Sequence, residues 1–126
     1  MASANSDGVY EKGMVFGVFD RLHEGHQHFL SDASSKCREL TVVVTLPEMV
    51  SLLKGRQPKQ SWEERVAALR AFNPKLNVVP GDSVAGAWSV ITTYMPDMIF
   101  LGHDQQAIAD ELRRIDKLFV FLERHR

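Results

Sequence analysis

Short, continuous runs of hydrophobic residues alternate along this chain with segments of helical periodicity. The clearest run is LTVVVTL at residues 40–46, which is rich in β-branched residues and has no polar alternation. Such runs are typical of strands that are buried on both faces of a parallel sheet. We expect five strands, at residues 14–19, 40–46, 77–80, 98–101 and 118–122.

Helical segments are expected between these strands, at residues 26–38, 48–53, 62–71, 84–94 and 105–114. Ser61 and Glu64 have the spacing of a capping box, with Ser61 as the N-cap. Alternating strands and helices predict an α/β fold: a Rossmann-like, doubly wound five-stranded parallel sheet with helices on both faces. In such a fold the ligand binds at the carboxyl ends of the strands, beside the first strand.

Length and charge limit the classes of function. A chain of 126 residues forms one domain, and we expect a flexible tail over residues 1–13 and a folded domain over 14–126. The net charge of −1 gives no support for a nucleic-acid or membrane partner, and no apolar run approaches the roughly 20 residues of a membrane helix. Cys37 is the single cysteine, so no intrachain disulfide forms and a cytoplasmic location is expected.

The loop after the first expected strand carries the chemistry, in the segment GVFDRLHEGH at residues 17–26. Gly17 would let a ligand approach the backbone where the strand ends. His23 and His26 share one face of a first helical turn, whose free amides and positive dipole end attract anions. Each histidine, kept neutral by that dipole, would donate an N–H group to a phosphate, and Gly25 would let the phosphate approach between them.

Two other interpretations of this loop compete with phosphate binding. Asp20, His23 and His26 have residue types and a spacing compatible with a transition metal. Alternatively, the histidines cap the helix and satisfy groups in the core. The strand–loop–helix context favours phosphate, and we therefore expect no metal held by the protein itself.

The same segment resembles the signature of the cytidylyltransferase-like nucleotidyltransferases, Gly-Thr-Phe-Asp-x-x-His-x-Gly-His-x-x-x-Leu, with Val18 in place of the usual threonine. Further segments at residues 54–56, 63–65 and 96–105 are similar to the archaeal-type FAD synthase. Together the matching segments extend from Met14 to Leu122.

This resemblance implies an adenylyl- or cytidylyltransferase. The enzyme would transfer a nucleoside monophosphate from a triphosphate, with ATP favoured over CTP, to a phosphorylated small molecule, with FMN as the best candidate. Pyrophosphate would be released, Mg²⁺ would be carried by the nucleotide, and the product would place the enzyme in FAD biosynthesis. The family is often dimeric, so a homodimer is a further expectation.

The resemblance also implies the residues of the site. His23 and His26 are implied to be catalytic. The residues implied to bind the nucleotide are Gly17, Val18, Phe19, His23, Glu24, Gly25, His26 and Asp104. Those implied to bind phosphate or substrate are Asp20, Lys54, Arg56 and Arg65.

Two of these residues have a second interpretation. With Ser61 as the N-cap, Arg65 lies near the positive end of its helix, where a cation costs about 0.3–1 kcal/mol and a phosphate partner would explain its presence. The alternative is a solvated arginine paired with a neighbouring glutamate. Asp104 would bind the ribose or the base, or it would cap the helix that begins at Gln105.

One element of the family pattern does not appear before the last residue, Arg126. The family has a Ser/Thr-rich helix start after the fifth strand, where phosphate binds. A non-catalytic nucleotide-binding module that lacks this segment is therefore an alternative interpretation. We expect Arg124 and Arg126 to replace part of the missing positive charge.

Overall fold

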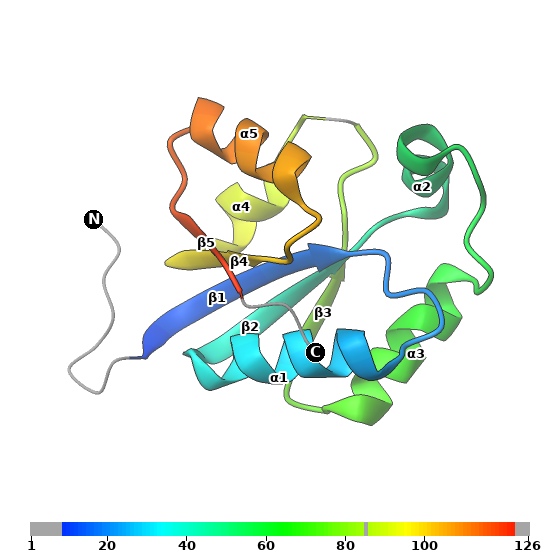
Figure 1. Ribbon diagram of the computed structural model, residues 1–126, viewed down its shortest axis with the longest axis horizontal. Coiled ribbons are helices and arrows are strands. Elements are labelled where there is room, and N and C mark those ends of the chain that lie inside the picture. The colour runs from blue at the N-terminus through cyan, green and yellow to red at the C-terminus, as the bar shows by residue number, and fades with distance from the viewer. Residues whose placement is uncertain (1–8, 85, 123–126) are drawn as a thin grey trace.

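The computed structural model describes residues 9–84 and 86–122, and these form one parallel sheet flanked by helices (Figure 1). The strand order is β3-β2-β1-β4-β5. The strands are β1 (Tyr10–Gly17), β2 (Cys37–Val44), β3 (Asn77–Pro80), β4 (Met98–Leu101) and β5 (Phe119–Phe121). β1 lies between β2 and β4, which is the position where a doubly wound sheet reverses its order and binds ligands.

Helices cover both faces of this sheet. They are α1 (Glu24–Ser35), α2 (Pro47–Lys54), α3 (Trp62–Phe72), α4 (Ser89–Tyr94) and α5 (Gln106–Arg114). In Figure 1, α1 and α3 lie on one face of the sheet and α4 and α5 on the other, while α2 lies apart from both layers. The predicted α/β, Rossmann-like fold is confirmed.

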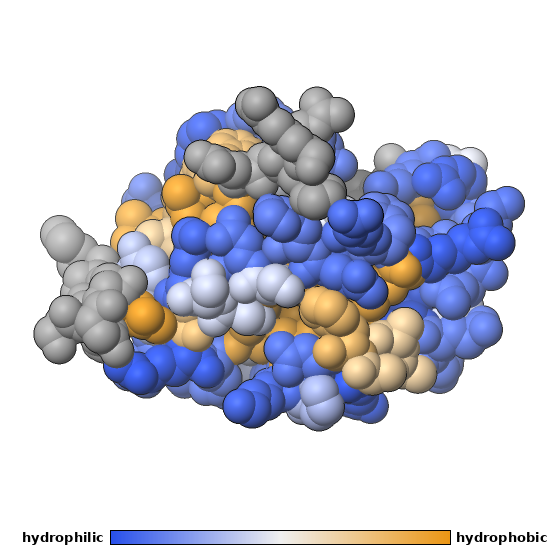
Figure 2. Space-filling view, turned by 60° about the horizontal axis from the view of Figure 1, so that its bottom comes forward, coloured by the Kyte–Doolittle hydropathy of each residue, from blue (hydrophilic) through white to orange (hydrophobic). Residues whose placement is uncertain are grey.

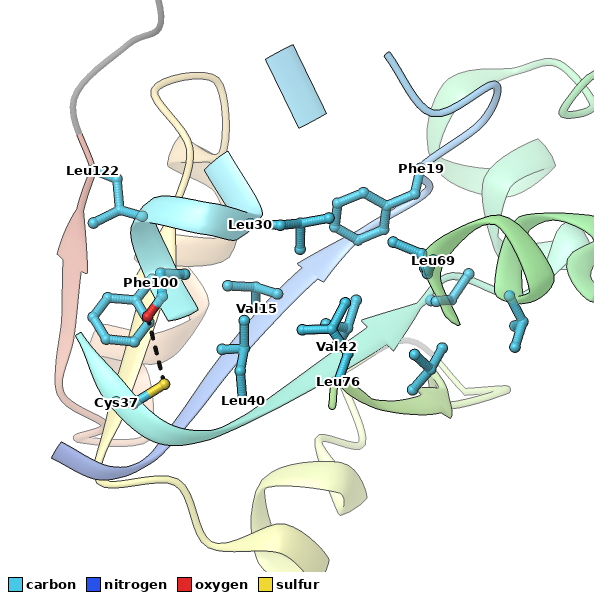
Figure 3. Close-up of a cluster of buried hydrophobic side chains, with 14 residues drawn as sticks. Val15, Phe19, Leu30, Cys37, Leu40, Val42, Leu69, Leu76, Phe100 and Leu122 are labelled. Carbon is cyan, nitrogen blue, oxygen red and sulfur yellow. Dashed lines mark hydrogen bonds between the residues drawn. The ribbon is translucent and has the colours of Figure 1, made fainter. Parts of the chain in front are cut away.

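Two hydrophobic cores, one on each face, hold the layers together. Val15 of β1 packs into the core that contains Leu30 of α1 and Leu69 of α3 (Figure 3). Its neighbours Met14 and Phe16 face the opposite core, beneath α4 and α5. Burying each such side chain stabilises the fold by about 1.5–3 kcal/mol, which explains why the strands lack polar alternation.

The first strand begins earlier than predicted. β1 starts at Tyr10, where its backbone N–H donates to Lys36 O over 3.0 Å. Residues 10–13 were expected in a flexible tail, and that part of the expectation is wrong. Tyr10 packs against the core, but Glu11 and Lys12, which follow it, are exposed and polar, so no hydrophobic run marks the start of this strand.

The other boundaries agree with the prediction to different degrees. β3 and β4 have the predicted bounds, and the Ser61–Glu64 capping box at the start of α3 is confirmed. The helix predicted over residues 84–94 is wrong in its first half, because α4 begins only at Ser89. Gly86 and Trp88 have φ values of 78° and 53°, and this left-handed backbone does not continue a helix.

β5 forms one edge of the sheet and leaves hydrophobic side chains exposed. Val120 and Phe121 of this strand are exposed, and so is Leu118 directly before it. Figure 2 shows hydrophobic atoms gathered at the upper left, over this edge.

None of the helices in the described ranges is both long and apolar enough to cross a membrane. The expectations for Arg124 and Arg126 lie outside the described residues.

Candidate active site

A cavity of about 650 Å³ opens at the carboxyl ends of β1 and β4. This is the place that the topology of a doubly wound sheet assigns to a ligand. Most of the predicted site residues line it, namely Gly17, Val18, Phe19, Asp20, His23, Gly25, His26, Lys54, Arg56 and Asp104. Glu24 and Arg65 are the two predicted residues that are absent from the lining.

His23 and His26 form a reciprocal cap at the start of α1. His23 is the N-cap, and its Nδ1 accepts hydrogen bonds from the backbone amides of Gly25 over 3.1 Å and His26 over 3.4 Å. In return, His26 Nδ1 accepts from the backbone amide of His23 over 3.4 Å. The two rings are stacked, with 3.7 Å between their centroids. The histidines therefore cap the helix and line the cavity at the same time.

This geometry corrects one feature of the predicted anion site. The amides of Gly25 and His26 were expected to be free for a phosphate, but they donate to the ring of His23. The same bonds fix the tautomers, because a ring nitrogen that accepts a hydrogen bond carries no proton. A neutral His23 or His26 ring therefore carries its proton on Nε2 and can donate from that atom.

His26 is neutral at physiological pH. Burial lowers the pKa of His26 to about 4, and the neighbouring His23 contributes to the shift. The carboxylates of Asp104 and Asp20 act in the opposite direction but do not reverse it. The expectation of a neutral histidine is supported, although burial rather than the helix dipole is the main cause.

We expect the titration of His26 to show this shift directly. In a pH series of ¹H–¹⁵N spectra, the midpoint for His26 should lie near 4, below the ordinary value of about 6.5. Between these values the unfolded chain binds a proton that the folded chain does not, so the free energy of unfolding should fall as the pH is lowered through this window. A midpoint above 6 would contradict the prediction.

The loop between β1 and α1 has a strained backbone, and the side chain of Phe19 anchors it in the core. Phe19 and Arg21 have φ values of 53° and 52°, in the left-handed region that non-glycine residues rarely adopt. The ring of Phe19 is buried next to Leu30 in the core (Figure 3) and meets the ring of His26 edge-on, with 5.4 Å between centroids. A Cβ atom on Gly17 would lie 2.7 Å from the Phe19 ring. Gly17 is thus needed to make room for Phe19, whereas the sequence suggested that it makes room for a ligand.

Three successive backbone carbonyls at the end of β1 are bound by three different segments. Phe16 O accepts from Gln105 Nε2 over 2.8 Å, and Gly17 O accepts from Thr45 N over 3.0 Å. Val18 O accepts from Arg65 Nη1 over 3.0 Å. The loops after β2 and β4 and the helix α3 therefore fix the start of the loop that carries the histidines.

Arg65 is buried and binds backbone, so it is not the solvated arginine of the alternative interpretation. Its side chain is completely buried, and the same Nη1 also donates to Thr45 O over 2.8 Å. Burial lowers its pKa, while Asp20 and Glu63 act to raise it. In this arrangement Arg65 binds backbone and does not line the cavity, while its Nε and Nη2 atoms are buried without a hydrogen-bond partner among the described residues. Its contact with a phosphate stays a prediction.

Lys54 and Arg56 supply the positive charge on the cavity wall. Lys54 is the last residue of α2, and Gly55 ends that helix with a φ of 69°, so the chain turns sharply between the two cations. Both side chains are exposed. Asp104 lies in the loop after β4, and because Gln105 is the N-cap of α5, the interpretation of Asp104 as the helix cap is wrong.

Two glutamines were not singled out from the sequence, although both lie in loops that the topology placed at the site. Gln105 connects β4 to β1, since its Oε1 accepts from Gly102 N over 2.9 Å while its Nε2 donates to Phe16 O. Gln60 Oε1 accepts from the backbone amide of Arg21 over 2.8 Å. A polar residue in the short loop between the buried strand β4 and the helix α5 was the available signal for Gln105. A single sequence contains no comparable signal for Gln60.

The described residues contain no group of three or more His, Cys, Asp or Glu side chains that could hold a metal ion. Both oxygens of Asp20 accept backbone hydrogen bonds, from Lys59 N over 2.8 Å and Gln60 N over 2.9 Å. Asp20 therefore acts as a connection between loops in this structure, and this differs from the substrate contact predicted for it.

Comparison with known protein families gives a match over nearly the whole described chain. Residues 14–125 match the family described as Cytidylyltransferase-like. The FAD synthase of Thermococcus sibiricus is 38% identical over 102 residues, which cover 78% of this chain and 69% of that protein. The FAD synthase of Pyrococcus abyssi is 40% identical over 106 residues, which cover 81% of this chain and 72% of that protein.

Solved structures agree on the fold. A lipopolysaccharide core biosynthesis protein from Thermoplasma volcanium superposes with a TM-score of 0.78 at 24% identity, covering 92% of this chain and 98% of that one. Pantothenate synthetase from Thermus thermophilus has a TM-score of 0.62 at 14% identity, covering 89% of this chain and 55% of that one. At these identities the likeness is one of fold alone.

Proposed function

We propose that this chain, which belongs to the cytidylyltransferase-like family and is a nucleotidyltransferase, transfers AMP from ATP to FMN and releases pyrophosphate. The observation that carries the proposal is the convergence on one cavity of two histidine rings and two cationic side chains, Lys54 and Arg56. The choice of ATP and FMN rests on the similarity to FAD synthases.

The reaction needs no general base, because the phosphate of FMN is already an anion at neutral pH. One of its oxygens attacks the α-phosphorus of ATP and forms a new P–O bond. The bond from that phosphorus to the oxygen that bridges to the β-phosphate breaks, and pyrophosphate leaves with the electron pair. The enzyme therefore acts by positioning the reactants and by stabilising the negative charge that builds up.

We assign this stabilisation to His23 and His26. Their Nδ1 atoms are engaged in the helix cap, so their Nε2–H groups would bind oxygens of the α-phosphate. A neutral donor strengthens its hydrogen bond as charge develops without a proton having to move. The pKa of about 4 for His26 is consistent with a ring that stays neutral while it does so.

The other lining residues would bind the rest of the nucleotide. Lys54 and Arg56 would neutralise the β- and γ-phosphates as two point charges. Asp104 would bind the ribose or the base from the loop after β4. Gly17, Val18, Phe19 and Gly25 would shape the surface on which the α-phosphate lies, and a role for Glu24 stays a prediction.

We propose that Mg²⁺ enters with the triphosphate. Asp20 and Asp104 are the carboxylates among the lining residues, and the oxygens of Asp20 are already engaged by backbone amides. This donor set fits an ion that phosphate oxygens hold for the most part. When bound, the ion would neutralise part of the charge of the triphosphate.

A non-catalytic nucleotide-binding module is the alternative, and it is not favoured, because the relatives that match over most of this chain are enzymes. The homodimer stays a prediction.

A substrate grid tests the proposal. ATP and CTP would each be combined with FMN, glycerol 3-phosphate and phosphopantetheine in the presence of Mg²⁺, with pyrophosphate release as the readout. We expect the largest kcat/KM for ATP with FMN and no turnover once EDTA has removed the metal. A module that only binds would raise its melting temperature with ATP and release no pyrophosphate in any combination.

A further inference from the structure

Two side chains connect the loop that carries the histidines to the segment that carries the cations. From the first loop, Asp20 accepts hydrogen bonds from the backbone amides of Lys59 and Gln60, over 2.8 and 2.9 Å. From the second segment, Gln60 accepts from the backbone amide of Arg21 over 2.8 Å. Each side chain thus binds the backbone of the other segment, and we call this arrangement the Asp20–Gln60 clamp.

The clamp follows directly on the exposed part of the cation-bearing segment. In Figure 1, α2 and the chain that follows it project beyond the sheet, apart from the layers formed by α1 and α3 and by α4 and α5. Lys54, Gly55 and Arg56 are exposed at the end of this projection. The clamp holds the chain only three residues after Arg56, at Lys59, so it restricts where the two cations can lie relative to the histidines.

The charges around Asp20 favour a carboxylate at this position. Burial acts to raise its pKa, but the hydrogen bonds from Lys59 and Gln60, together with the charges of Arg65 and Arg21, hold the pKa below its ordinary value. An ionised carboxylate can accept from two amides at once, whereas an asparagine in its place would turn one donor toward another donor. A carboxylate also repels the negative charge of a triphosphate, and this argues against direct substrate binding by Asp20.

We propose that Asp20 and Gln60 are positioning residues, which hold Lys54 and Arg56 over the same triphosphate that the histidine pair contacts. This inference rests on the proposed function for the identity of the ligand. Neither residue needs to touch the nucleotide, because the clamp acts through the two cations. Its loss should therefore weaken nucleotide binding only in a protein that still has those cations.

A double-mutant comparison tests this dependence. Asp20→Asn would be made in the natural chain and in a Lys54→Ala/Arg56→Ala background, and the Kd for the Mg²⁺ complex of α,β-methylene-ATP would be measured by calorimetry. We expect Asp20→Asn to raise Kd by about tenfold in the natural chain and by less than about twofold in the background without cations. Equal factors in the two backgrounds would overturn the proposal, because a purely structural role would not depend on the cations.

Gln60→Ala provides a second route in case Asp20→Asn fails to fold, since it removes a single hydrogen bond and exposes the Arg21 amide to water. Gln60→Ala should also raise Kd only in the chain that has Lys54 and Arg56, and by a smaller factor than Asp20→Asn does. Asp32→Asn, an identical substitution in a surface pair on α1, is the matched control and should leave Kd unchanged. If the natural chain binds the analogue but releases no pyrophosphate when it is given ATP and FMN, the proposed function fails. The dependence of Kd on the two cations then still decides the role of the clamp. A natural chain that does not bind the analogue contradicts both.

Discussion

Replacing His26 with alanine should lower kcat by about 10²–10³-fold, as is typical when one donor to a developing negative charge is removed. The expected loss is in kcat rather than in KM, because the bond from Nε2 strengthens as the reaction proceeds. Steady-state pyrophosphate release with ATP and FMN would measure it. An unchanged kcat in an active preparation would exclude His26 from the chemistry.

The helix cap complicates this substitution, since His26→Ala also removes the acceptor for the His23 amide. His26→Gln separates the two effects, because glutamine at the third helical position can accept the same hydrogen bond in a capping box. We expect His26→Gln to keep the melting temperature and to lose most of the activity. Gln27→Ala, at the next position on α1, is the control for the helix and should change neither quantity.

Replacing Arg65 with alanine should lower the free energy of unfolding by about 3–5 kcal/mol. Two backbone carbonyls, Val18 O and Thr45 O, would lose the donor that both share, at a cost of about 1–3 kcal/mol for each unpaired group. A cavity would remain where the largest of the fully buried side chains had been. Urea unfolding followed by circular dichroism would measure the change.

Two further variants make the Arg65 result specific. Arg65→Met fills most of the same volume but supplies no hydrogen-bond donor. It should therefore lower the free energy of unfolding by less than Arg65→Ala does, and the difference is the contribution of the cavity. Arg70→Ala, on the exposed side of the same helix, should change stability by no more than about 0.5 kcal/mol. A loss below about 1 kcal/mol for Arg65→Ala would show that water satisfies the two carbonyls equally well.

The fold was predictable because it depends on a pattern that a single sequence contains in full. Residues 40–46 are hydrophobic without alternation, which requires burial on both faces, and alternating helices then require parallel strands. The start of β1 was not predictable in the same way. Lys12 pairs with Glu39 through its backbone, and Glu11 belongs to the same strand. The side chains of both residues are exposed, so no hydrophobic pattern marks them.

The location of the cavity was also predictable, since topology brings the loops after β1, β2 and β4 to one edge of the sheet. The bonding within the site was not. A sequence places His23 and His26 three residues apart, but it does not show that their Nδ1 atoms bind the helix amides and leave Nε2 to donate. For the burial of Arg65 the sequence did contain a signal, because a leucine, Leu69, lies four residues further along the same helix face. The structure shows that Leu69 is completely buried.

The most direct test of nucleotidyl transfer follows the α-phosphorus itself. The protein would be incubated with Mg²⁺, FMN and ATP that is labelled with ³²P at either the α- or the γ-position, and the products would be separated by chromatography. We expect the α-label to appear in FAD and the γ-label to appear in pyrophosphate. ATP that binds to the protein while no α-label enters FAD or any other acceptor product would contradict the proposed reaction.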